Sequence, residues 1–304
     1  MSPPWTAEEI VAPALAAALL EEQFPALAPV VVAPLGVGWD NTAYLVNDAH
    51  VVRFPRRQIA VALLEAEARL LPWIAGRVPL PVPVPSLHGQ PSARFRWPFL
   101  GYGHLAGTTA CRLALGDAER AAVAPALGTF LAALHALPVS EARRLGAGGD
   151  TIGRLDLRTK VPRAHAYLDG LGDAVSAADA AAARALLAAA ATIAAPPSEA
   201  LVHGDLYARH LLLDARTRLC GVIDWGDVHV GHPAVDLSVA IGFLPPAARP
   251  AFVHAYGPID AETWRLARFR ALWSALAILG YGRDIGDGDL VREGGRALGH
   301  ALAA

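Results

Sequence analysis

The sequence predicts an α+β protein with a small β-rich N-terminal part and a larger helical C-terminal part. Up to about residue 107, most of the chain reads as short strands separated by glycine, proline and asparagine turns. From about Thr108, long segments rich in alanine and leucine follow with helical period, and one strand-like stretch at 199–230 interrupts them. A chain of 304 residues suits one large domain or two small ones with a sizeable core.

The N-terminal part begins with a segment of helical period over 6–24, which carries acids near its start. The stretch 30–57 reads as three short strands separated by turn formers. An amphipathic helix over 58–77 follows. The turns predicted between the three strands contain Gly36 and Gly38, and Asn47 and Asp48.

A proline-rich connector over 79–87 can form only extended chain or the edge of a sheet, because proline has no N–H to donate to a central strand. Two strand-like pieces within 92–107 follow it. We therefore place a small antiparallel sheet with a helix in a first lobe, 1–102. The remaining residues, 103–304, form the second lobe.

The second lobe is predicted to be mostly helical around its strand-like stretch. No internal repeat is found. The glycine-rich run at 146–150 predicts a flexible surface loop. The helical segments predicted here are 115–137, 157–170, 174–194, 245–256, 260–281 and 289–303.

The composition excludes several classes of protein. A formal net charge of −2 argues against a nucleic-acid binder or a polybasic membrane-surface protein. Cys111 and Cys220 fit neither a zinc pattern nor a disulfide framework, which favours a reducing compartment. The N-terminal stretch lacks the basic start of a secretory signal, and no run is apolar enough to span a bilayer, so we expect a cytoplasmic protein. Lys160 is the only lysine, so arginine must do the work usually given to lysine. Oligomeric state is not indicated by the sequence.

Two carboxylates stand at strand ends in the strand-like stretch. Asp205 follows His203 and Gly204, and Asp224 closes an apolar strand at 219–223, 19 positions later. This arrangement fits a β-hairpin that brings both acids to one spot. Carboxylates paired in this way perform acid/base chemistry or hold a divalent cation.

The N-terminal part supplies groups that complement these acids. Backbone N–H groups of the turn at Gly36 and Gly38 can face phosphates. Arg53 stands in the middle of a strand, and either Glu65 or Glu67 on the next helix can pair with it. A phosphate-binding turn, a cation, a helix acid and two further acids together indicate phosphoryl transfer.

The motifs resemble those of the aminoglycoside-phosphotransferase family, which shares the two-lobed protein-kinase fold. Protein kinases carry His-Arg-Asp, an Asn five residues after that Asp, and then Asp-Phe-Gly after a strand. Here the matching positions are His203-Gly204-Asp205, His210 and Asp224-Trp225-Gly226. Glycine before the first Asp and tryptophan after the second are typical of the antibiotic-kinase branch. The likeness extends over nearly the whole chain, roughly from residue 30 to residue 284.

The resemblance implies a role for each matching position in the second lobe. Asp205 is the catalytic residue that accepts or orients the proton of the acceptor hydroxyl. Asp224 holds the Mg²⁺ ion that bridges the phosphates of ATP or GTP. Asp236 braces the catalytic region, and His203 is structural.

In the first lobe the resemblance places nucleotide-binding residues. Glu67 matches the family's helix acid better than Glu65 does. Arg53 stands where the family usually has a nucleotide-binding lysine. The segment from Gly101 to Leu105 is the expected hinge that receives the base, and its residues include Tyr102, His104 and Leu105.

Two departures from the usual pattern point to one branch of the family. Arginine replaces lysine at Arg53, and histidine replaces asparagine at His210. An imidazole nitrogen suits softer metals than Mg²⁺, so His210 either binds a second metal or only forms hydrogen bonds. Macrolide phosphotransferases are similar to this chain at both positions. We therefore expect a macrolide acceptor before an aminoglycoside.

The acceptor is expected to bind in the helical lobe, at residues from 157–170 and 260–284. Arginines and aromatic residues in the second segment suit a large apolar acceptor better than a polycation. Asp287 and Asp289 keep the aminoglycoside alternative open. A kinase of an ordinary metabolite and a nucleotide-binding pseudokinase also remain as alternatives. A protein kinase is disfavoured, because no arginine stands beside the catalytic Asp and no Ala-Pro-Glu segment is found.

Overall fold

The computed structural model describes residues 7–38, 40–194 and 197–303. The chain divides into two compact units, of which the first contains residues up to 76 together with 81–106. The second contains 77–80 and the residues from 107 onward. The β-rich first part and the helical second part predicted from the sequence are both present.

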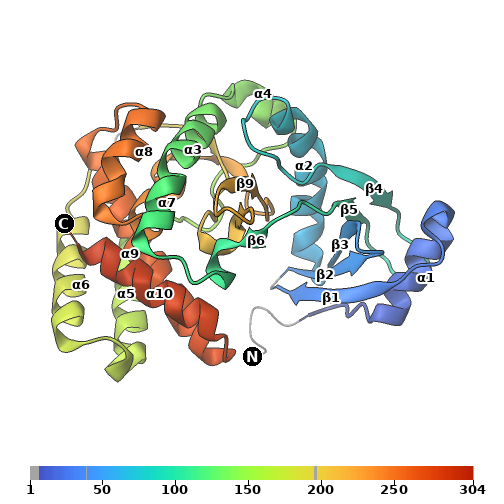
Figure 1. Ribbon diagram of the computed structural model, residues 1–304, viewed down its shortest axis with the longest axis horizontal. Helices are drawn as coiled ribbons and strands as arrows, with labels where there is room; N and C mark the ends of the chain where they lie inside the picture. Colours follow the sequence, from blue (N-terminus) through green and yellow to red (C-terminus); the bar gives the residue numbers. More distant parts are fainter. Residues whose placement is uncertain (1–6, 39, 195–196, 304) are drawn as a thin grey trace. The chain divides into compact units, whose positions relative to one another are not determined.

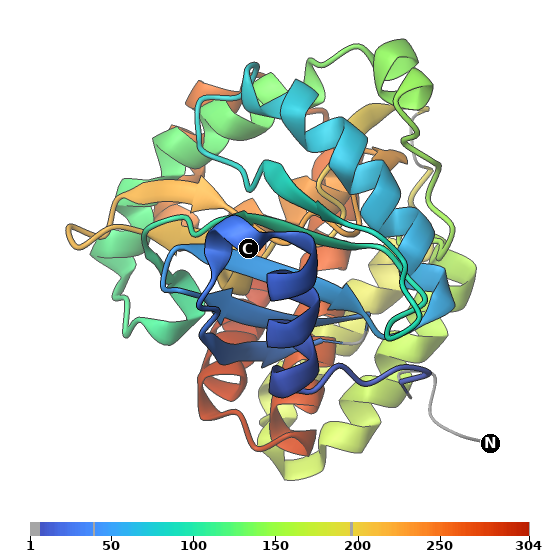
Figure 2. The same cartoon turned by 90° about the vertical axis from the view of Figure 1, so that its right-hand side faces the viewer.

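In the described part of the first unit, an antiparallel sheet has the strand order β1-β2-β3-β5-β4. Figure 2 shows helix α1 lying across these strands. Residues of α1 and of the strands share one hydrophobic core, in which the rings of Phe54 and Phe99 stack with centroids 4.6 Å apart. The elements are α1 (Pro13–Gln23), η1 (Pro25–Leu27), β1 (Val32–Val37), β2 (Asn41–Val46), β3 (His50–Pro55), α2 (Gln58–Ala75), β4 (Pro85–Gly89) and β5 (Phe99–Gly103).

The turn between β2 and β3 forms where the sequence predicts it. Asn47 and Asp48 both have positive φ, 49° and 53°, as a type I′ hairpin turn requires. The Asn47 carboxamide also accepts a hydrogen bond from the Val31 N–H at 2.8 Å. The last residues of the proline-rich connector enter β4, which lies at the end of the sheet, one of the two outcomes expected for them.

Two predictions for the first unit are wrong. The first helix begins at Pro13 rather than near residue 6, because proline is favoured in the first turn and the acids before it lie outside the helix. The first of the two strand-like pieces at 92–107 is a loop. Phe95 and Trp97 of this loop are buried against the sheet instead of extending it.

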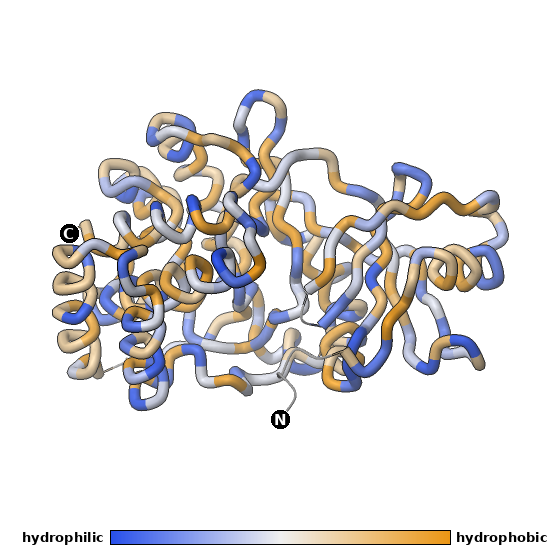
Figure 3. Tube along the Cα trace, turned by 90° about the horizontal axis from the view of Figure 1, so that it is seen from below, coloured by the Kyte–Doolittle hydropathy of each residue, from blue (hydrophilic) through white to orange (hydrophobic). Residues whose placement is uncertain are grey.

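The second unit is mostly helical, and hydrophobic and hydrophilic residues are interleaved along its helices (Figure 3). Helices α9 and α10 pack side by side, and α9 also packs against α5 and α7 (Figure 1). Its helices are η2 (Ala110–Arg112), α3 (Asp117–His135), α4 (Val139–Arg144), α5 (Leu157–Leu171), η3 (Gly172–Ala174), α6 (Ala177–Ala190), η4 (Ala208–His210), α7 (Ala234–Gly242), η5 (Pro246–Ala248), α8 (Arg249–Tyr256), α9 (Ala261–Asp284) and α10 (Gly288–Leu302). None of the helices in the described residues is long and apolar enough to cross a membrane.

Two small sheets lie among these helices, with strand orders β6-β8-β9 and β10-β7. The strands are β6 (Thr108–Thr109), β7 (Ala200–Val202), β8 (Leu211–Leu213), β9 (Leu219–Val222) and β10 (His229–Gly231). The glycine-rich run predicted to be a flexible loop is tied to β10, because Gly148 C=O accepts from Val230 N–H at 2.7 Å. Ala147 in the same run is buried.

Candidate active site

The loop after β7 carries His203, Gly204 and Asp205, and its shape requires glycine at the middle position. Gly204 has φ +90°, in the left-handed region that favours glycine. A Cβ atom there would lie 2.2 Å from the Asp227 carbonyl oxygen. The glycine is therefore needed for both the backbone turn and the close approach of a second chain segment.

Asp236, an acid in the first turn of α7, holds this loop through hydrogen bonds to its main chain. Its Oδ2 accepts from the His203 N–H at 2.6 Å, and its Oδ1 accepts from the Gly204 N–H at 2.9 Å. Burial alone would raise the pKa of the Asp236 carboxyl, but the hydrogen bond and charge of His135 and the loop N–H groups hold that pKa below its usual value. The bracing contact predicted for Asp236 is confirmed.

His203 is fully buried and acts within the loop. Its Nε2 donates to the Ile223 carbonyl at 2.9 Å, which leaves Nδ1 to accept from the Asp205 N–H at 3.3 Å. Burial lowers the pKa of His203, so the neutral ring is favoured. The ring also lies against buried Trp225, with centroids 4.7 Å apart. These contacts match the structural role expected of His203.

The β8–β9 hairpin brings the second acid to the loop. Leu211 pairs with Val222, so His210 and Asp224 stand beside each other at one end of the hairpin. Asp224 has φ +63°, which few residues other than glycine adopt and which is common at functional turns. Trp225 anchors the turn, because its Nε1–H donates to the Val222 carbonyl at 3.0 Å.

His210 lies between the two acids. Its Nδ1 is 2.6 Å from the Asp205 carbonyl oxygen, and its Nε2 is 3.3 Å from Asp224 Oδ2. Burial lowers the pKa of His210, but the hydrogen bond to Asp224 and the charges of Asp224 and Asp205 outweigh it and raise the pKa overall. Both ring nitrogens thus face oxygen acceptors, and the arrangement fits a hydrogen-bonding bridge better than a metal ligand.

The donor set fits a divalent cation bound through one carboxylate. Across the described ranges, no group of three or more His, Cys, Asp or Glu side chains could hold a metal by itself. Mg²⁺ commonly binds through one or two carboxylates together with substrate phosphates and water. The Asp224 side chain is 53% exposed and can provide such a carboxylate.

Three buried cations lie at or next to the Asp205 loop, and of these Arg154 lies outside the segments expected to bind the acceptor. Arg154 donates from Nε to the Gly204 carbonyl at 2.9 Å and from a terminal nitrogen to Asp150 at 2.9 Å, and it also pairs with Asp227. Arg270 of α9 places a terminal nitrogen 3.9 Å from Asp205 Oδ1. Lys160 of α5 adds its charge to that of Arg270. Lys160 and Arg270 lie in the two segments expected to bind the acceptor, whereas Arg154 was not predicted.

In the first unit, Arg53 and Glu67 form a buried ion pair. One terminal nitrogen of Arg53 lies 2.8 and 2.9 Å from the two carboxylate oxygens. Val52 and Phe54 point to the core shared with α1, so Arg53 points to the opposite face of the strand, where α2 packs. Glu65 is exposed, so Glu67 is the helix acid that pairs with Arg53.

The glycines of the predicted phosphate turn lie partly in the sheet. Gly36 belongs to β1 and stands opposite Ala43. Gly38 follows the strand, and its N–H donates to the Asn41 carbonyl at 2.9 Å. That N–H is engaged within the turn in this structure, so a phosphate contact there stays a prediction.

The predicted hinge residues continue from β5. Tyr102 lies within the strand and is buried. His104 is exposed, and its N–H donates to the Ala49 carbonyl at 2.8 Å. Leu105 follows, and its main chain forms no hydrogen bond to the residues that the structure describes. A role for these residues in holding the base stays a prediction.

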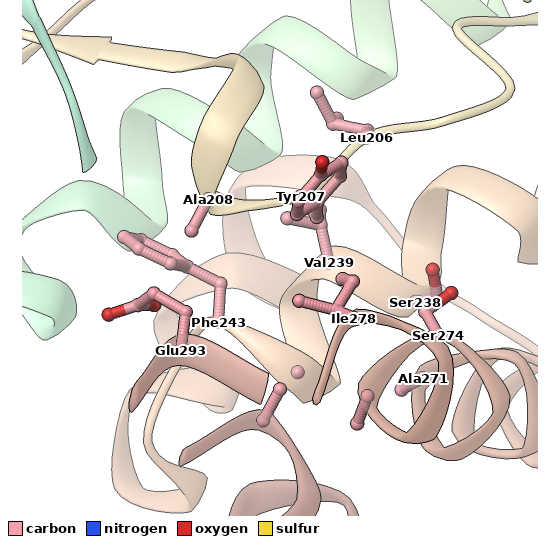
Figure 4. A pocket seen from close by; sticks show the side chains of 13 residues that line it. Leu206, Tyr207, Ala208, Ser238, Val239, Phe243, Ala271, Ser274, Ile278 and Glu293 are labelled. Atoms are coloured by element: carbon pink, nitrogen blue, oxygen red, sulfur yellow. The ribbon is translucent and has the colours of Figure 1, made fainter. Parts of the chain in front are cut away.

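A small cavity lies beside the loop that follows β7, between Tyr207, Phe243 and Ile278 (Figure 4). Its volume of about 40 Å³ is far below the several hundred Å³ typical of a ligand pocket. Glu293 at its edge forms a buried pair with Arg120 at 2.5 Å. We interpret the cavity as a packing gap rather than an acceptor site.

Comparison with known proteins supports the resemblance to phosphotransferases. Residues 31–271 match the model of a phosphotransferase enzyme family. The chain is similar to the GDP complex of wild-type aminoglycoside 2'-phosphotransferase-IIIa, with 24% identity and a TM-score of 0.72 over 96% of this chain and 99% of that one. It is also similar to the GDP and kanamycin complex of APH(2")-IIia, with 26% identity and a TM-score of 0.69 over 94% and 97%.

Macrolide phosphotransferases share the fold as well. The apoenzyme of macrolide 2'-phosphotransferase MphH from Brachybacterium faecium is 24% identical, with a TM-score of 0.59 over 88% of this chain and 91% of that one. Among curated proteins no match was found. Because the family model covers most of the chain, this protein belongs to the phosphotransferase enzyme family and is a small-molecule kinase with the two-lobed, kinase-like α+β fold.

Proposed function

We propose that the protein transfers the γ-phosphoryl group of ATP or GTP to a hydroxyl group of a small molecule. The observation that carries this proposal is the placement of Asp205 and Asp224 on either side of His210. In the proposed reaction, Asp205 accepts or orients the proton of the acceptor hydroxyl. Rate enhancement then comes mainly from positioning and from neutralising phosphate charge.

Asp224 is the proposed ligand of Mg²⁺, which would supply positive charge to the nucleotide phosphates. His210 would orient both acids by donating to the Asp224 carboxylate and to the Asp205 carbonyl. Arg53 is the proposed phosphate contact in the first unit, and Glu67 would fix its guanidinium. Arginine suits this role because its planar group binds phosphate through two N–H donors.

The nucleotide base is proposed to bind the segment of Tyr102, His104 and Leu105. The Leu105 main chain supports this assignment, because its polar groups are not engaged within the described residues. The turn at Gly36 and Gly38 is proposed to lie near the phosphates. A phosphate contact at Gly38 would require its N–H to leave Asn41 or to be shared.

Among antibiotics, a macrolide is a better candidate acceptor than an aminoglycoside. An aminoglycoside is a polycation and calls for free acidic side chains. Asp287 and Asp289 are instead engaged by Arg112, at 3.0 and 2.8 Å. The departures at Arg53 and His210, which this chain shares with macrolide phosphotransferases, point the same way.

A metabolite alcohol is the second candidate acceptor. The observation that favours it is the buried charge of Lys160 and Arg270 beside Asp205, which would repel a cationic drug and attract an acid.

Mass spectrometry of the acceptor tests the proposal directly. The purified protein is incubated with Mg²⁺ and either ATP or GTP, against a panel of macrolides, aminoglycosides and simple metabolite alcohols. We expect one acceptor class to gain the mass of a phosphoryl group. Asp205→Asn should lower turnover by about 10²–10⁴-fold while the fold survives, because it removes the base but keeps the side-chain volume.

Asp117→Asn is the matched control, because Asp117 is an exposed acid at the start of α3, outside the segments expected to bind the acceptor, and pairs with Arg296. It should leave turnover unchanged. Near-normal transfer by a folded Asp205→Asn variant would refute the assigned chemistry. Nucleotide binding without transfer to any acceptor would favour the pseudokinase.

A further inference from the structure

A cluster of three side chains on α5 and α9 brings polar hydrogens together without acceptors. Its members are Lys160, Arg270 and Trp273. Lys160 is 3% exposed and Arg270 is 5% exposed. Within the described chain, no hydrogen bond involves the ammonium of Lys160, the guanidinium of Arg270 or the indole N–H of Trp273. The Arg270 Nε and the Trp273 Nε1 are fully buried and unsatisfied.

The two cations share one aromatic ring. Lys160 Nζ lies 5.0 Å from the centroid of the Trp273 ring, and the Arg270 guanidinium carbon lies 4.7 Å from it. Tyr167 packs edge-on against the same ring at 5.9 Å. Cation–π attraction offsets only part of the cost of burying a charge.

The neighbouring acids offset the charge of these two cations only in part, and none of them accepts a hydrogen bond from either. Asp150 hydrogen-bonds to Arg154, and Asp227 also pairs with Arg154. Asp205 is the acid nearest to Arg270, but the 3.9 Å separation is too long for a hydrogen bond. Burial and mutual repulsion lower the pKa of Lys160, in keeping with a cation that lacks a partner.

Buried donors without acceptors are rare, because each loses its hydration and gains nothing in return. An arginine offers five N–H donors, a lysine three and a tryptophan one. A ligand with several negatively charged oxygens would satisfy them at once. The Asp205 side chain beside Arg270 and the residue Tyr167 beside Trp273 are each 42% exposed, so solvent reaches the neighbours of the cluster.

We propose that Lys160, Arg270 and Trp273 form an oxyanion subsite beside Asp205. The inference deepens the proposed function and rests on it, because the subsite would hold an anion next to the reacting hydroxyl. Two sources share this chemistry. One is a carboxylate or phosphate group of the acceptor, and the other is the phosphoryl group during its transfer.

Sulfate binding tests the subsite without any transfer reaction. Sulfate is titrated into the nucleotide-free protein by calorimetry and by tryptophan fluorescence. We expect Lys160→Met and Arg270→Met each to weaken sulfate binding by at least about tenfold, since each removes charge-assisted hydrogen bonds. Trp273→Phe should abolish the fluorescence change while the calorimetric signal persists in weakened form.

Arg265→Met is the matched control, because Arg265 is an exposed cation on the same helix and pairs with Glu262. It should bind sulfate like the unmodified protein. Thermal unfolding of each variant shows whether it is folded. Arg270→Lys provides a variant that keeps the charge, and it should retain part of the affinity. Equal sulfate binding by the unmodified protein and both Met variants, or no binding by any of them, would overturn the proposal.

Two further arms distinguish the sources of the anion. In the first, simple hydroxy acids and their uncharged amides are compared as acceptors. If the unmodified protein prefers the acid and Lys160→Met loses this preference, the site binds the acceptor. In the second, aluminium fluoride is bound with nucleoside diphosphate and Mg²⁺ as a mimic of the phosphoryl group in transit. Weaker binding of this mimic by Lys160→Met assigns the site to the transferred group.

The sulfate result separates this inference from the proposed function. If sulfate binds in the expected way but no acceptor is phosphorylated, the subsite is supported and the proposed transfer reaction is refuted. If transfer occurs but the affinity for sulfate does not depend on Lys160 and Arg270, only the proposed subsite is refuted.

Discussion

Two arginines with nearly equal burial have opposite surroundings. Arg53 in the first unit is 7% exposed and faces the Glu67 carboxylate at 2.8 Å. Arg270 in the second unit is 5% exposed and has no hydrogen-bond acceptor among the described residues. Burial alone therefore does not tell whether a charge is structural. Buried donors left without a hydrogen-bond acceptor indicate a ligand, whereas a charge with a protein partner, such as Arg53, can serve the fold as well.

The largest effect is expected from removing the partner of Arg53. Glu67→Gln keeps the side-chain shape but removes the negative charge from a buried pair, which should lower the free energy of unfolding by about 3–5 kcal/mol. Glu65→Gln on the same helix is the control. Because this position is exposed, the substitution should change the free energy of unfolding by less than about 0.5 kcal/mol. Urea unfolding of both variants measures the difference. Equal stabilities would show that Arg53 does not depend on Glu67.

A third arginine sharpens the comparison within the second unit. Arg154 is as buried as Arg270, but it bonds to the Gly204 carbonyl and to two acids. Arg154→Met should lower the free energy of unfolding by about 2 kcal/mol, because a buried carbonyl and Asp150 lose their donor. Turnover should fall as well, since Gly204 precedes Asp205, the proposed catalytic residue. Thermal unfolding and the transfer assay check both effects, and a variant as stable as Arg270→Met would remove the distinction between the two arginines.

Sequence alone predicts the parts of the site that are local or carried by motifs. His203, Asp205 and Asp224 stand in short runs whose glycine and tryptophan neighbours fix the turns, and the structure brings the two acids together around His210. Asp236 was also predicted, and its contacts with the loop N–H groups confirm its bracing role.

The placement of the cations near Asp205 could not be predicted, because it depends on contacts between segments that are distant in the sequence. Arg154 meets Gly204 across 50 positions of the chain. Arg270 and Lys160 meet only because α5 packs against α9.

Helix α7 is not among the helices that the sequence predicts. It is buried on all sides from Ala234 to Ile241, so it shows no amphipathic period.

The smallest expected effect has the opposite sign. Lys160→Met removes a buried ammonium that has no acceptor, and methionine fills similar space without a charge. We expect the free energy of unfolding to stay equal or to rise by about 0.5–2 kcal/mol, because the cation–π attraction to Trp273 stabilises the fold by less than the burial of the ammonium destabilises it. The same variant should bind sulfate more weakly. Higher stability together with weaker anion binding is the signature of a residue kept for its ligand, whereas a clear drop in stability would mean that Lys160 serves the fold.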